Sequence, residues 1–347
     1  MRWLLTLALL APTTGWGFDY FQPLPERPPF PADNPPTAEK IALGKKLFFD
    51  ASLLGRGSRL SCNHCHNLAE GGDDNRPLSL GQHGQRSRRN APGLWNIGFQ
   101  TVLYWDGRAT SLEAQTLNHL RDPMVIGARS LGEVVQYVAG SEEYRRLFAA
   151  AFPGDSAVSG NSAVSGDSAV NGEHLAKAMA SFERSLLAPD SPFDRFMRGD
   201  ANALSENAKR GMQAFNDVGC LACHFGTNFA GPAPGPALGL GDGFYELFPN
   251  HLGSKYETRY RLADDLGRFE YTGDPGEKYM WRVPPLRNIA QTAPYFHNGS
   301  VNTLPEAVRV MAKTQLKKDL SEETVRDIVA FLNSLTGRQC LVLSAKC

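Results

Sequence analysis

The sequence of 347 residues has no excess of charge of either sign, with 36 Lys and Arg against 36 Asp and Glu. This balance gives no overall case for binding to nucleic acid or to a membrane surface. Beyond the N-terminus, no apolar run reaches the ~20 residues that a membrane-spanning helix needs. Strand-like segments are scarce, and no βαβ pattern is found. We therefore expect a mainly α-helical chain, whose length predicts two domains.

The N-terminus joins a short charged start to a short apolar run. Met1-Arg2 precedes an apolar segment over residues 3–11, and small and polar residues follow up to Gly17. This order is typical of a secretory signal peptide, here predicted over residues 1–17, and an uncleaved anchor is the alternative. Export predicts a periplasmic mature chain with no membrane span.

Cysteine is scarce, and four of the six cysteines fall into two copies of one pattern. The segment CNHCH over residues 62–66 recurs as CLACH over residues 220–224. In a C-x-x-C-H motif the two thiols add to the vinyl groups of one porphyrin, and the histidine becomes the proximal iron ligand. A zinc site would need four ligands at finger-like spacings, and a redox C-x-x-C does not need the histidine. The sequence therefore predicts two covalently bound c-type haems, held by Cys62, Cys65, His66, Cys220, Cys223 and His224.

Two cysteines remain at the C-terminus. Cys340 and Cys347 either close a small disulfide loop in an oxidising compartment or stay as free thiols. His64, inside the first motif, is expected to face solvent.

The rest of the chain is organised around the two motifs. Residues 18–36 are rich in proline and aromatic residues and predict an extended arm. Loops rich in glycine are expected over 71–90 and 226–285, and three tandem hexapeptides over 155–172 predict a flexible surface insertion. A Pro-rich break at 188–192 divides an N-terminal unit, 18–190, from a C-terminal unit, 191–347. Helical periodicity covers 37–49, 111–119, 131–152, 173–187, 205–215, 304–312 and 321–335.

Several longer motifs resemble those of one family. They are LGKKLFFD at 43–50, NAP at 90–92, WDGRA at 105–109, PLRNI at 285–289 and APYFHNG at 293–299. The chain resembles the bacterial di-haem cytochrome c peroxidases, which include the MauG-type enzymes. The resemblance implies two cytochrome-c-like helical domains, each with one covalently bound haem, and a calcium ion at their interface.

The resemblance also assigns ligands. It places Met311 as the distal ligand of a high-potential second haem, where MauG has tyrosine; a core methionine is the alternative. Asn90, Thr292 and Pro294 match the family's calcium ligands, and oxygen ligation suits that ion. His83 matches a distal histidine that blocks the first haem in its oxidised state; a solvent-exposed loop histidine is the alternative.

Other positions bear on catalysis. Trp105 matches the tryptophan between the haems, which relays electrons or serves as a packing spacer, and Gln115 matches a pocket glutamine. Val125 stands where the family places an acid–base glutamate, and valine moves no proton. Glu113 lies on a different helix face from Gln115. Arg129 and Glu133 are the remaining polar candidates nearby.

Three functions follow from these assignments. The first is reduction of hydrogen peroxide at the first haem, with electrons entering the second haem from a small periplasmic donor, a cytochrome c or cupredoxin. The second is MauG-like oxidation of a protein side chain. The third is a di-haem electron carrier or redox sensor, which Val125 favours. A homodimer is left open, because no interface can be identified in the sequence.

Overall fold

The computed structural model of the chain describes residues 20–55, 58–122, 130–153, 169–232, 239 and 242–341. The predicted signal peptide, Val125, Arg129 and Cys347 lie outside these ranges. Within them the chain is mostly helical, with four short strands in two antiparallel pairs. No described helix is both long and apolar enough to cross a membrane.

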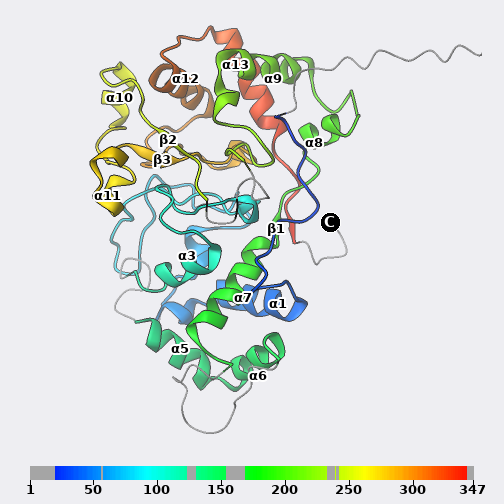
Figure 1. Cartoon of the computed structure of the whole chain (residues 1–347), viewed down its shortest axis with the longest axis vertical. Coiled ribbons are helices and arrows are strands. Elements are labelled where there is room, and N and C mark those ends of the chain that lie inside the picture. Colours follow the sequence, from blue (N-terminus) through cyan, green and yellow to red (C-terminus); the bar gives the residue numbers. More distant parts are fainter. Residues whose placement is uncertain are drawn as a thin grey trace, which may run out of the picture.

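The first half is built on two helices in close contact. Helix α1 (Ala38–Phe49) begins after Thr37, whose side chain accepts a hydrogen bond from the Lys40 backbone, and it packs against α7 (Gly172–Arg184). A Cβ atom at Gly44 would lie 2.0 Å from the Ala178 carbonyl oxygen, so only glycine permits this approach. Helix α3 (Leu112–His119) packs on α7, and α5 (Leu131–Gly140) and α6 (Glu142–Ala151) complete this end of the molecule (Figure 1).

The second half also contains a pair of helices whose close contact depends on a glycine. Helices α9 (Glu206–Val218) and α13 (Glu322–Ser334) cross where a Cβ at Gly211 would lie 1.8 Å from the Asp327 carbonyl oxygen. Helix α12 (Leu304–Leu316) packs on α13. Figure 1 shows these three helices at the opposite end of the molecule from α1, α5 and α6. The two halves are thus two cytochrome-c-like helical domains, and the boundary at 190 and 191 remains our proposal.

The shorter elements connect these helices. They are η1 (Ala51–Leu54), α2 (Cys62–Cys65), η2 (Ile97–Phe99), β1 (Leu186–Leu187), α8 (Pro192–Met197), η3 (Cys220–Ala222), β2 (Tyr245–Leu247), α10 (Lys255–Tyr260), α11 (Phe269–Thr272), η4 (Pro275–Glu277), β3 (Met280–Arg282), η5 (Ile289–Gln291) and β4 (Cys340–Leu341). Strand β1 pairs with β4, and β2 pairs with β3.

The extended arm is confirmed over its described residues, and it spans both halves (Figure 1). Phe21 is buried among the aromatic side chains of the second half. Farther along, the Asn34 side chain donates to Glu113 Oε1 at 2.7 Å and to the Lys177 carbonyl oxygen at 3.0 Å in the first half. The arm therefore joins the two halves, through an apolar contact in the second half and hydrogen bonds in the first.

Four sequence predictions need correction. The periodic segment 131–152 is two helices, because Ser141 ends α5 and its side chain caps α6. The predicted insertion over 155–172 extends too far, since Ala169 and Val170 are buried and Asn171 caps α7. The helix predicted over 173–187 ends at Arg184, and Leu186–Leu187 forms β1. The loop over 226–285 also contains β2, α10, α11 and β3. At the C-terminus, Cys340 is disulfide-bonded.

Candidate haem sites

The two C-x-x-C-H motifs each form a short helical turn, α2 in the first and the 3-10 helix η3 in the second, and share one hydrogen bond. The His66 backbone N–H donates to the Cys62 carbonyl oxygen at 3.0 Å, and His224 does the same to Cys220, also at 3.0 Å. A helical turn places the two thiols of each motif on one side of the backbone. All four motif cysteines are free, as thioether formation requires.

Each proximal histidine is oriented through one ring nitrogen. His66 Nδ1 lies 3.1 Å from the carbonyl oxygens of both Gly72 and Pro92, and His224 Nδ1 lies 2.9 Å from that of Phe229. Carbonyl oxygens only accept, so Nδ1 carries the proton and Nε2 is left with its lone pair for iron. Burial lowers the pKa of both histidines, which favours the neutral, ligating form.

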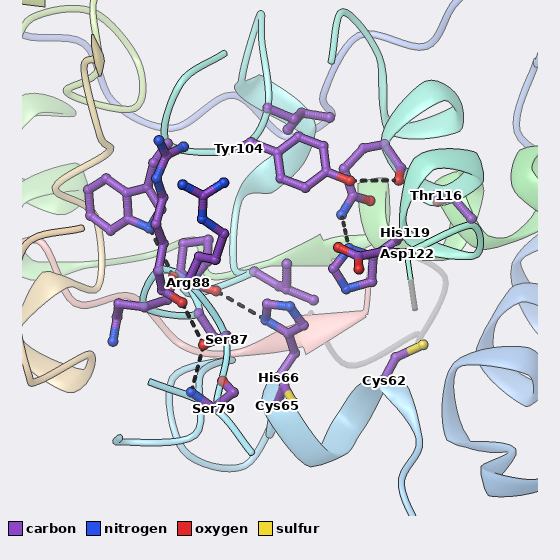
Figure 2. Close-up of a pocket in the computed structure, with 18 of the residues that line it drawn as sticks. Cys62, Cys65, His66, Ser79, Ser87, Arg88, Tyr104, Thr116, His119 and Asp122 are labelled. Carbon is purple, nitrogen blue, oxygen red and sulfur yellow. Dashed lines mark hydrogen bonds between the residues drawn. The ribbon is translucent and has the colours of Figure 1, made fainter. Parts of the chain in front are cut away.

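A cavity of about 510 Å³ opens beside the first motif, a volume within the range of cofactor pockets, roughly 300–1,000 Å³. Cys62, Cys65 and His66 line one wall, and Tyr104 and His119 line the wall across from them (Figure 2). This shape and donor set fit a covalently attached haem.

Buried polar groups in this cavity also point to a bound cofactor. Thr116 Oγ1 and Glu183 Oε2 are buried without a hydrogen-bond partner among the described residues. Burial raises the pKa of Glu183 to about 8, and burial together with Glu183 raises that of the Cys62 thiol to about 12. Such unpaired buried groups are costly, and a ligand with polar substituents would satisfy them.

The second site lies between two hydrophobic clusters. Cys220 packs at the edge of the cluster around Phe215 and Phe331, and Met311 packs at the edge of the cluster around Trp281. Ile289 and Leu304 contact both clusters, so they join the two walls. Cys220 and Met311 thus pack on clusters that share two side chains, and the assignment of Met311 as an iron ligand remains our proposal.

His119, at the end of α3, is a site residue that the sequence reasoning missed. Its ring lines the first cavity, and Figure 2 shows it above His66, on the wall opposite α2. Gln115 Nε2 lies 3.5 Å from His119 Nδ1, and Tyr104 Oη donates to the Gln115 carbonyl oxygen at 3.2 Å. Burial, followed by the nearby His66, lowers the pKa of His119 to about 4, so the ring is neutral.

The other polar candidates lie elsewhere. His83 is exposed and does not line either described cavity, and His64 is exposed as predicted. Glu113 forms a two-bond ion pair with Arg184, at 2.6 and 2.8 Å. Glu133 accepts from the Ser130 backbone in the capping box of α5. Neither glutamate lines the first cavity, whereas the carboxylate of Asp122 does.

Trp105 lines both the first cavity and a second, smaller one of about 70 Å³. Its Nε1 donates to the Asn90 carbonyl oxygen at 2.9 Å, and its ring meets the His297 ring edge-on at 6.5 Å. Trp105 and Met311 belong to the same hydrophobic cluster. The indole therefore stands between the first cavity and the hydrophobic cluster on which Met311 packs.

The small cavity brings together the three predicted calcium residues. Asn90, Thr292 and Pro294 all line it. The Asn90 amide nitrogen donates to the carbonyl oxygens of Arg76 and Pro77, which leaves its Oδ1 as an available acceptor. Oxygen donors suit calcium, and the ion itself remains our proposal.

Comparisons with known proteins agree with this arrangement. A family model described as di-haem cytochrome c peroxidase matches residues 38–202, and one described as RoxA-like, cytochrome c-like, matches residues 280–315. The chain is 39% identical over 321 residues to the cytochrome c551 peroxidase of Pseudomonas aeruginosa, covering 92% of this chain and 85% of that one. It is 32% identical over 330 residues to the methylamine utilization protein MauG of Methylophilus methylotrophus, covering 90% and 87%.

Solved structures show the same fold. The crystal structure of a MauG-like protein associated with microbial copper homeostasis aligns with a TM-score of 0.72 and 29% identity, over 94% of this chain and 96% of that one. The diheme peroxidase BthA from Burkholderia thailandensis aligns with a TM-score of 0.63 and 21% identity, over 88% and 87%. With both attachment motifs, both proximal histidines and these relatives, the chain belongs to the di-haem cytochrome c peroxidase family and is an oxidoreductase of the di-haem peroxidase type.

Proposed function

We propose that this enzyme reduces hydrogen peroxide to water in the periplasm, using electrons from a small cytochrome c or cupredoxin. The observation that carries the proposal is the first cavity, where the haem attachment motif faces a wall of polar side chains that includes Gln115, His119 and Asp122. An electron carrier needs no such polar wall, because a carrier binds no substrate at its iron.

The two sites take different roles in this proposal. Haem iron supplies electron transfer at the second site and peroxide binding at the first. His66 and His224 would hold the irons through Nε2, since their Nδ1 atoms are fixed by backbone carbonyl oxygens. The Met311 thioether favours a high potential at the second site, which suits electron entry. Trp105 relays electrons between the sites, since it lines the first cavity and shares a cluster with Met311.

The deciding experiment is peroxide turnover by the half-reduced, haem-loaded protein, with calcium and a reduced small c-type cytochrome present. Rapid oxidation of the cytochrome, with two molecules consumed per peroxide, is the expected result. Negligible turnover that is restored in a Val125→Glu variant would mean that the scaffold is intact but lacks an acid–base group, and the peroxidase proposal would be abandoned. MauG-like oxidation of a protein side chain and redox sensing are the readings that would then remain.

The assignment of Met311 makes a separate prediction. Replacing Met311 with histidine should lower the potential of the second haem by on the order of 0.1 V, a fraction of the ~0.8 V that axial ligands span. Turnover with a high-potential donor should fall accordingly, because electron entry becomes unfavourable. Spectroelectrochemical titration of the two haems measures the shift. A Val308→Ala variant is the matched control on the same helix, and equal shifts in both variants would refute ligation by Met311.

A further inference from the structure

The backbone follows the same path, position by position, over residues 92–119 and over residues 284–311. Each begins at a proline beside a proximal histidine: the Pro92 carbonyl oxygen accepts from His66 Nδ1 at 3.1 Å, and the backbone of Pro284 raises the pKa of His224. The two stretches therefore start from the same position relative to their haem motifs.

The turns that follow are also the same. Asn96 and Asn288 both adopt left-handed conformations, with φ of 65° and 60°, and each caps a 3-10 helix, η2 or η5. The two asparagines meet in the buried interior, where Asn96 Nδ2 lies 3.5 Å from Asn288 Oδ1. This contact marks the point where the two repeats face one another.

In each stretch the next feature is a loop closed by a single antiparallel β-bridge. Leu103 N donates to the Ala109 carbonyl oxygen at 2.8 Å, and Tyr295 N donates to that of Val301 at 2.7 Å. The tips correspond residue by residue, with positive φ at Tyr104 and Gly107 in one and at Phe296 and Gly299 in the other. Trp105 and His297, whose rings touch, occupy the same place in the two loops.

Each loop leads into a helix with a hydroxyl residue at its N-cap. Ser111 precedes α3, and Thr303 precedes α12. His119 is the last residue of the 8-residue α3, and Met311 holds the same eighth position in α12. His119 therefore occupies, relative to the first site, the position that Met311 occupies relative to the second.

We propose that His119 is the distal axial ligand of the first haem iron in the oxidised protein, as the counterpart of Met311 at the second haem. This rests on the two-haem assignment above, and it refines how the peroxide site is regulated. Neutral imidazole is a good iron ligand. His119 lines the cavity across from His66 (Figure 2). His83 is exposed and does not line this cavity.

The arrangement of α3 supports a ligand that can be held and released. Gln115, one turn earlier, lies with its amide Nε2 3.5 Å from His119 Nδ1. In this orientation the amide nitrogen donates to Nδ1, so the imidazole proton is on Nε2. Turning the amide so that Oε1 accepts from Nδ1–H would free Nε2 for iron, as the backbone carbonyl oxygens do for the proximal histidines. While His119 is bound, peroxide has no open position at this iron.

The test uses the full-length protein with both haems attached, fully oxidised, and examined by low-temperature electron paramagnetic resonance. The unsubstituted protein is expected to show two low-spin haems. In His119→Ala one haem becomes high-spin, and added imidazole restores the low-spin signal. The apparent affinity of that haem for cyanide rises by at least about tenfold, since the ligand no longer competes for the iron. His83→Ala is expected to retain both low-spin signals.

A His119→Met variant is the control for misfolding of His119→Ala. It should keep two low-spin haems and raise the potential of the first haem, because thioether ligation raises haem potential. A first haem that is already high-spin in the unsubstituted protein, or a low-spin signal lost in His83→Ala and retained in His119→Ala, overturns the proposal. None of these readouts needs peroxide turnover, so absence of peroxidase activity would refute the proposed function and leave the ligand assignment standing.

Discussion

Replacing His66 with alanine is expected to lower peroxide turnover by more than roughly 100-fold, because even the loss of a ligand's hydrogen-bond partner typically costs roughly 10–100-fold. His66 is the one motif histidine that lines the first cavity, and its Nδ1 is held by two carbonyl oxygens. Removing the ring takes away the proximal iron ligand while both thioether bonds can still form. The measurement is steady-state peroxide reduction with a reduced small cytochrome as donor.

His64→Ala is the matched control for this variant. His64 belongs to the same motif and is exposed, and no described cavity includes it. Its removal should leave turnover nearly unchanged. Haem content must be two per chain in both variants, so that lost activity is not confused with lost attachment. Turnover by His66→Ala close to that of His64→Ala would show that the first haem is not the peroxide site.

Features encoded by adjacent residues could be predicted from the sequence. The C-x-x-C-H motifs identify the covalent sites because that chemistry requires neighbouring residues. Helix starts were found to within one residue at Ala38, Leu112, Glu206 and Glu322, since a serine or threonine cap precedes each of them. Capping is a local interaction, so its sequence trace is strong.

Features that depend on tertiary contacts were harder to predict. The break at Ser141 was missed because the apolar periodicity continues across it, and one cap decides that two helices form. Strands β2 and β3 are three residues each and form only because they pair with one another. Their stability comes from tertiary contacts, and such short segments leave little strand signal in the sequence.

His119 was missed for a different reason. A histidine at a helix end has no motif of its own, and its position gains meaning only from the match between 92–119 and 284–311. The signal was present in the sequence as Asn-Ile at 96–97 and 288–289, with Gly107 and Gly299 at matching places. A comparison of the chain with itself from those points would have paired His119 with Met311.

A buried ion pair between Arg287 and Asp194 holds several segments that are distant in the sequence in fixed positions. Both side chains are fully buried, and Arg287 Nη2 lies 2.9 Å from Asp194 Oδ1. The guanidinium also donates to the carbonyl oxygens of Thr227, at 2.6 Å, and Gln22, at 3.0 Å. Asp194 in turn accepts from the Leu24 backbone at 2.8 Å. One cluster thus joins the arm, α8, the loop after the second haem motif and the repeat that carries Met311.

The charges in this cluster depend on one another. Burial raises the pKa of Asp194, but the charge of Arg287 and the hydrogen bonds to the carboxylate outweigh it, so the net shift is downward. Burial lowers the pKa of Arg287, and Asp194 opposes that shift. Each ion is tolerated inside the protein only because the other neutralises it.

Arg287→Ala is therefore expected to reduce the free energy of unfolding by about 3–5 kcal/mol, because it leaves Asp194 as an unpaired charge in the interior. The free energy of unfolding of Arg287→Lys should lie between those of Arg287→Ala and the unsubstituted protein. An ammonium group keeps the charge but cannot reproduce the guanidinium's several directed bonds. Urea denaturation of the haem-loaded protein measures both. Arg261→Ala is the matched control, because Arg261 pairs with Asp264 at the surface, where their side chains are 79% and 54% exposed. Water can replace that partner, so little change in the free energy of unfolding is expected. Equal losses in Arg287→Ala and Arg261→Ala would show that burial of the Arg287 pair does not hold the arm, α8 and the second repeat together.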